Sequence, residues 1–121
     1  MKGNLTLRQK KLSETIRRQI AEIIEREILN DLEDNYFIAV HRAIISADLR
    51  VVNVYLGISV DDDAFKKEVL AFFNSKAKFI RHLLIKRIEL RVAPNIFFHE
   101  DSFNGYSMDF LMSLSGVAED E

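Results

Sequence analysis

The chain has 121 residues, of which 48% are hydrophobic and 30% charged. This suits one folded domain with a single core and excludes an intrinsically disordered protein. Cysteine is absent, which excludes disulfides, thiolate metal sites and a cysteine nucleophile. No apolar run approaches the roughly 18–20 residues that a membrane helix needs, and the charged N-terminus lacks the apolar segment of a secretion signal. We therefore expect a cytoplasmic protein.

The formal net charge of −2 conceals an uneven distribution of charge along the chain. Residues 1–18 and residues 76–91 each contain six lysines or arginines against one glutamate, so each segment carries +5. Residues 95–121 contain six acidic residues and no lysine or arginine. Two basic segments in a nearly neutral protein could present a local positive patch to a polyanion.

The first predicted element is an amphipathic helix. We expect residues 1–12 to form a flexible basic arm, followed by a helix with Ser13 as its N-cap. Five isoleucines recur at helical spacing and form an apolar stripe: Ile16, Ile20, Ile23, Ile24 and Ile28. The helix is expected to end near Asn30, where polar residues accumulate.

Two strands joined by a turn are predicted next. In residues 37–47 the apolar side chains fall on both faces, which is typical of a central strand. Residues 46–49 indicate a turn, without the Asn-Gly signal of a tight hairpin. In residues 50–59 every second side chain is apolar, which predicts a half-buried strand.

A pair of helices is predicted over residues 64–74 and 76–88. Asp61-Asp62-Asp63 precede the first helix of this pair. Acidic side chains at such a position cap free N–H groups and suit the positive end of the helix.

A strand from about Pro94 to Asp101 follows, since proline marks its start and apolar residues alternate within it. A short helix over residues 105–114 and an acidic tail over residues 115–121 complete the chain. The order helix, strand, strand, helix, helix, strand predicts an α+β sandwich, in which helices pack on one face of a three-stranded sheet. We expect a single domain over residues 13–114.

The candidates for catalysis or metal binding are weak. On a strand, His99 and Asp101 face one way and Glu100 the other, so a polar strand end is favoured over a metal site. Asp61-Asp62-Asp63 lack the spaced ligands and the glycine of a calcium loop. His41 is interpreted as a packed or surface histidine. We expect no catalytic residue, metal or cofactor, with a metal-dependent enzyme around His99 as a remote alternative.

The helix predicted over residues 76–88 is the remaining candidate site. Phe79 and Ile80 are expected in the core, with basic side chains on the opposite face. Such a face either is only solvated or meets phosphate, with backbone amides at the helix N-terminus adding hydrogen bonds. Ile85 falls in the middle of the basic face, and Arg87 projects toward the apolar side near the helix end.

Four stretches of the chain resemble one protein family in order and spacing. They are residues 20–28, IAEIIEREI; residues 45–49, ISADL, with Val54-Tyr55; residues 79–84, FIRHLL; and residues 90–98, LRVAPNIFF, through Asp101-Ser102. The family is ribosome-binding factor A, a small ribosome-assembly factor of bacteria and organelles. The resemblance implies a type II KH-like fold, α-β-β-α-α-β, which agrees with the element order predicted above.

The resemblance also implies a non-enzymatic role. A member of this family binds the small (30S) ribosomal subunit, as a monomer, and assists late maturation and processing of 16S rRNA. In the family an Ala-x-Gly kink joins the paired helices, and it falls here on Lys76-Ala77-Lys78. Lys78 replaces the glycine, which adds charge at the expected RNA-facing point.

We therefore expect rRNA to contact the basic helix and the N-terminal arm. The primary residues are Lys76, Lys78, Arg81, His82, Lys86 and Arg91, and the secondary ones are Arg8, Lys10, Lys11, Arg17 and Arg18. The alternative is a protein-interaction module of the same fold, in which Ile85 and the C-terminal helix dock a partner protein. In neither hypothesis do we expect a membrane or a small-molecule substrate.

Overall fold

The computed structural model describes residues 5–29, 38–59 and 61–101. Three helices, a π-helical segment and three strands make up this part of the chain. In order they are α1 (Leu7–Ile23), η1 (Ile24–Ile28), β1 (Ile38–Ile45), β2 (Val51–Ile58), α2 (Asp63–Ser75), α3 (Ala77–Arg87) and β3 (Asn95–Glu100). This order confirms the predicted α+β architecture. The predicted C-terminal helix and acidic tail lie outside the described residues.

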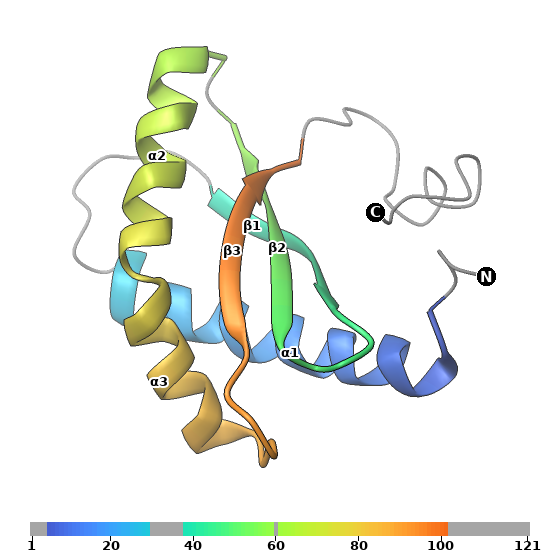
Figure 1. Cartoon of the computed structure of the whole chain (residues 1–121). Helices are drawn as coiled ribbons and strands as arrows, with labels where there is room; N and C mark the ends of the chain where they lie inside the picture. Colours follow the sequence, from blue (N-terminus) through green and yellow to red (C-terminus); the bar gives the residue numbers. More distant parts are fainter. Residues whose placement is uncertain (1–4, 30–37, 60, 102–121) are drawn as a thin grey trace.

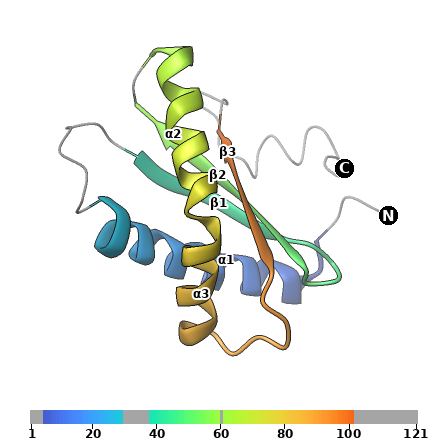
Figure 2. The same cartoon turned by 60° about the vertical axis from the view of Figure 1, so that its left-hand side comes forward.

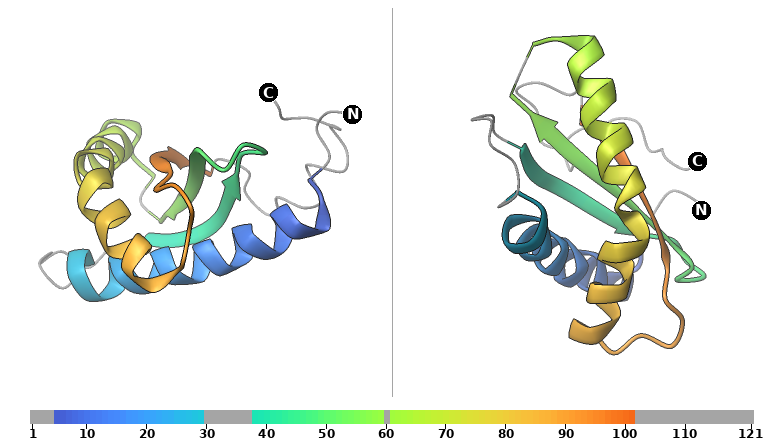
Figure 3. Two further views of the ribbon diagram at one scale, coloured as in Figure 1. Left: turned by 60° about the horizontal axis from the view of Figure 1, so that its bottom comes forward. Right: turned by 90° about the vertical axis from the view of Figure 1, so that its left-hand side faces the viewer.

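The three helices cover one face of a three-stranded sheet (Figure 1). α1 crosses the sheet on one side and packs against β1, and the C-terminal half of α1 meets α3 (Figure 3). α2 and α3 form an almost continuous column that runs beside β3 (Figure 2). The strands bury one set of side chains against these helices: Ile38, Ala43, Ile45, Val52, Val54, Leu56, Ile96 and Phe98.

The predicted start of the first helix is wrong. α1 begins at Leu7, and Thr6 is its N-cap: the Gln9 amide donates to Thr6 Oγ1 at 3.0 Å, and Thr6 N donates to Gln9 Oε1 at 3.2 Å. This reciprocal capping box satisfies two N–H groups at once, so residues 7–12, expected as part of a flexible arm, are helical. Ser13 instead lies within α1 and is buried, and its hydroxyl accepts a hydrogen bond from the backbone N–H of Ile45 at 3.0 Å.

The predicted isoleucine stripe is confirmed. Ile16, Ile20 and Ile23 are fully buried in α1, and Ile24 and Ile28 are almost fully buried in η1. The stripe lies at the centre of the hydrophobic core, because every strand and both other helices contribute side chains to the same cluster.

The expectation that β1 is the central strand is wrong. The strand order is β1-β2-β3, with β1 antiparallel and β3 parallel to β2, so β2 is central. The β1 register shifts between Val40 and Arg42, as in a β-bulge, and this reverses which side chains face the core. Ile38 is buried before the shift, and Ala43 and Ile45 after it. The apolar residues at both odd and even positions of β1 are therefore explained by a bulge in an edge strand.

The bulge directs the side chain of His41 across the neighbouring strand. Its ring covers Gly57, where an added Cβ would lie 2.2 Å from His41 Cε1. His41 Nδ1 lies 2.9 Å from Asp101 Oδ2, whose side chain is only 5% exposed. The absence of a side chain at Gly57 thus makes room for a contact between β1 and the residue that follows β3.

On β2 and β3, Tyr55 and His99 stack with ring centroids 5.1 Å apart. His99 Nε2 lies 2.8 Å from Asn53 Oδ1 and is placed to donate to it. Burial lowers the pKa of His99 below its ordinary value. Folding therefore favours the neutral form of this imidazole relative to the unfolded chain.

We predict that Gly57→Ala costs about 1 kcal/mol of stability, because the new methyl group forces the His41 ring away from Asp101. In a His41→Ala background the same substitution should be neutral or slightly stabilising, since no ring occupies the space. Urea denaturation of the four proteins of this double-mutant cycle measures the difference. Equal costs in both backgrounds would contradict the described packing.

We also predict that His99 makes folding less favourable in mild acid. The unfolded chain binds a proton at His99 near its ordinary pKa of 6.5, whereas the folded chain binds it only at lower pH. Stability is therefore full above about pH 6.5 and falls as the pH drops toward the folded pKa. His99→Gln, which keeps a donor for Asn53, should lose less stability between pH 7.5 and 5 in thermal melts. An unchanged pH dependence in this variant would count against the assignment.

Candidate nucleic-acid interface

The position of α3 depends on two buried side chains. Ile80 and Leu84, one turn apart, have no exposed surface and pack into the core. Lys76 lies between α2 and α3 with φ −96° and ψ 3°, so one non-helical residue separates the two helices. The break between the helices predicted over residues 64–74 and 76–88 is present, but it falls later, at Lys76, because α2 continues through Ser75.

The prediction that Phe79 belongs to the core is wrong, since this residue is 44% exposed. Ile80 and Leu84 point most directly inward, and Phe79 lies about 100° from Ile80 and about 140° from Leu84 on the helical wheel. It therefore lies at the margin of the apolar face, beside the basic residues. The prediction that Ile85 lies within the basic face is consistent with its 41% exposure.

The exposed basic side chains of α3 form a ridge along the helix, which we call the α3 ridge: Lys78, His82 and Lys86. Their spacing of four residues places them on the same side of the helix. All three side chains belong to exposed residues, and within the described chain none of them forms an ion pair. The ridge is therefore free to meet an external anion.

Two other predicted cations precede and follow α3 in the chain. Lys76 is exposed, and its Nζ lies 5.7 Å from the centroid of the Phe72 ring. Arg91 is exposed in the segment between α3 and β3. Neither has an acidic partner in the part of the chain that the structure describes. Both can contribute to the positive potential around the ridge.

Arg81, predicted as a primary contact, is engaged within the protein. Its Nη2 donates to Ala93 O at 3.1 Å, and its Nε is buried without a hydrogen-bond partner. The side chain thus holds the segment between α3 and β3 against the helix. Its main role in this arrangement is to position that segment.

Arg87 connects α3 to α1. Its Nη1 pairs with Glu22 Oε1 and donates to Gln19 Oε1 at 3.1 Å. The hydrogen bond from Arg87 lowers the pKa of Glu22, and the charge of Arg26 adds to this effect. The charge of Arg87, whose side chain projects toward the apolar side of α3, is therefore neutralised by Glu22 where the two helices cross.

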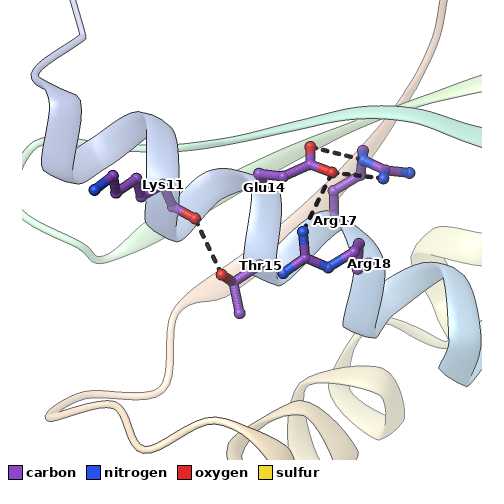
Figure 4. A network of polar contacts seen from close by, with 5 residues as sticks. All are labelled: Lys11, Glu14, Thr15, Arg17 and Arg18. Atoms are coloured by element: carbon purple, nitrogen blue, oxygen red, sulfur yellow. Dashed lines mark hydrogen bonds and ion pairs between the residues drawn. The ribbon is translucent and has the colours of Figure 1, made fainter.

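The predicted cations of α1 divide into two groups. Arg17 binds both carboxylate oxygens of Glu14, at 2.9 and 2.7 Å, and Arg18 lies 3.7 Å from the same carboxylate (Figure 4). The hydrogen bond from Arg17 lowers the pKa of Glu14. This carboxylate therefore offsets part of the positive charge, whereas Arg8, Lys10 and Lys11 are exposed with no ion pair in the described chain.

The structure does not gather all the predicted cations into one patch. The first turns of α1 lie beside the β1–β2 connection, where Gln9 Nε2 donates to Ile45 O at 3.3 Å. α3 meets the opposite half of α1, at Gln19 and Glu22 (Figure 1). About 16 Å of helix separates Lys11 from Glu22. The two basic regions are therefore distinct surfaces.

The acidic candidates have structural roles. Asp62 is the N-cap of α2, as predicted, and accepts a bond from Phe65 N at 3.2 Å. Glu100 pairs with Lys66 at 2.9 Å. Residues 5–29, 38–59 and 61–101 contain no group of three or more His, Cys, Asp or Glu side chains that could hold a metal ion. In the same residues, no helix is long and apolar enough to cross a membrane.

Known structures share this fold. The solution structure of a Thermotoga maritima protein described as a ribosome binding factor A aligns with a TM-score of 0.68 and 23% identity, over 85% of this chain and 96% of that chain. The crystal structure of ribosome-binding factor A from Thermus thermophilus aligns with a TM-score of 0.64 and 21% identity, over 76% and 94% of the two chains.

Sequence relatives give the same result. Ribosome-binding factor A of Prochlorococcus marinus strain MIT 9312 is 35% identical over 91 residues, which are 75% of this chain and 69% of that protein. The Clostridium perfringens protein of the same name is 32% identical over 112 residues, or 93% and 96% of the two chains. The family model for ribosome-binding factor A matches residues 8–111, and the chain belongs to this family.

Proposed function

We propose that this protein is a non-enzymatic ribosome biogenesis factor of the cytoplasm. In this proposal it binds the small (30S) ribosomal subunit as a monomer and assists late maturation and processing of 16S rRNA. Its family supports the proposal, as does one structural relative. A homology model of Thermus thermophilus ribosome binding factor A, 23% identical with a TM-score of 0.58, was fitted into a cryo-electron-microscopy map of a 30S–RbfA complex.

The observation that carries the proposal is the unpaired α3 ridge. Lys78, His82 and Lys86 are exposed on one side of a helix and have no ion pair within the described chain. Phosphate contacts supply most sequence-independent affinity for nucleic acid, because each one releases counterions. A protein of net charge −2 needs such a local concentration of cations to bind rRNA.

The first turns of α1 supply a second contact in the proposal, through Arg8, Lys10 and Lys11. Arg17 and Arg18 contribute less, because Glu14 offsets their charge. Two separated basic surfaces suit binding to the folded shape of rRNA, since each can meet a different part of the backbone.

A second candidate function is docking of a partner protein on α3. It is favoured by the exposure of Ile85 at 41% and of Val92 at 52% in the segment that follows the helix. In that case the cations of the ridge keep the surface solvated and are not required for binding. The two candidates differ in whether charge or the apolar side chains dominate the affinity.

We predict that Lys78→Glu combined with Lys86→Glu releases the protein from small subunits in sucrose-gradient sedimentation. Each substitution replaces attraction to phosphate by repulsion, and the melting temperature should change little because both positions are exposed and unpaired. Arg81 is left intact, since its bond to Ala93 O contributes to the fold.

The matched control is Lys67→Glu, which makes the same charge change at an exposed position on α2. This variant should co-sediment normally, whereas Lys78→Glu alone should reduce binding and lower the slope of log affinity against log salt by about 1. Normal sedimentation of the double variant would rule out the α3 ridge. If Ile85→Ser alone releases the protein, docking of a partner protein is the better explanation.

A further inference from the structure

An exposed aromatic ring, that of Phe79, lies on α3 beside the α3 ridge. Phe79 is 44% exposed and follows Lys78 directly in the helix. Phe72, Phe73 and Phe98 pack ring against ring in the core region. Phe79 has no such ring contact in the described part of the chain. Its exposed face is therefore available to a partner.

The surroundings of Phe79 limit the chemistry of that partner. Lys78 is its immediate neighbour, and His82 lies one turn further along the exposed side of α3. A partner here must offer an apolar surface to the phenyl ring, negative charge to Lys78, and a hydrogen-bonding group to His82. An unpaired nucleotide combines these properties, since its base is flat and its phosphate is anionic. A base-paired duplex hides its base faces and presents only phosphates to such a surface.

We propose that Phe79 is a stacking platform for an unpaired base of rRNA, so that α3 binds a single-stranded segment. The bound segment runs along the α3 ridge. Lys78 and Lys86 are eight residues apart, about 12 Å along the helix, and hold separate phosphates of the strand. This inference rests on the proposed function and names the kind of RNA that the same surface takes.

The test uses a 12-nucleotide mixed-sequence RNA with 2-aminopurine near its centre, as a single strand and as a duplex with its complement. The variants are Phe79→Leu, which removes the aromatic face, and Phe79→Trp, which keeps one. The matched control is Phe97→Leu, because Phe97 is 47% exposed and lies on β3, away from the ridge. Affinities are measured over a range of salt concentrations.

We expect Phe79→Leu to weaken binding of the single strand about tenfold, in line with the usual effect of losing one stacked base. The salt dependence should stay the same, since no phosphate contact is removed. Phe79→Trp should retain the affinity and quench 2-aminopurine. Binding of the duplex, the melting temperature and all properties of Phe97→Leu should be unchanged.

The proposal is overturned if Phe79→Leu binds the single strand like the wild type, or if it weakens the duplex equally. It is also overturned if Phe79→Leu lowers sedimentation with small subunits but leaves binding of the oligonucleotide intact, since Phe79 then docks a protein. These failures differ from failure of the proposed function. If Lys78→Glu with Lys86→Glu abolishes sedimentation while Phe79→Leu has no effect, the RNA-binding ridge stands and only the stacking role is lost.

Discussion

The burial of one isoleucine stripe under the sheet is the constraint on which the rest of the structure depends. Full burial of each aliphatic side chain contributes about 1.5–3 kcal/mol, and five such residues line up on α1 and η1. Polar bonds then fix the alignment, because Ser13 and Gln9 both bond the backbone of Ile45 in β1. With α1 attached to the sheet in this way, α3 can pack across its far half.

α3 packs only one side against the core, and its opposite side is exposed. Ile80 and Leu84 are its fully buried side chains, and Arg87 joins it to Glu22 of α1. Because only one side of α3 is buried, the helix can expose lysines and a phenyl ring together. Whether a basic side chain can bind an external anion depends on its neighbours. Arg17 shares its charge with a nearby carboxylate, whereas the lysines of the α3 ridge have none within the described residues.

The junction between α2 and α3 shows how the chain departs from the family pattern without losing the break. The position that resembles the family's glycine is Lys78, which lies inside α3, and its φ is not positive. The interruption occurs at Lys76, whose φ of −96° any residue can adopt. A glycine is therefore not required here, and the two lysines place positive charge at the start of the helix.

The sequence by itself determined the order of the elements and most of their ends, because helical and strand periodicity and turn residues act locally. The cap at Thr6 was also a local signal, since Gln9 follows it three residues later, but the basic composition of residues 1–12 obscured it. Only the tertiary structure decided which strand is central, which cations are neutralised, and that Phe79 is exposed. These properties depend on segments far apart in the chain, whose approach fixes the neighbours of each side chain.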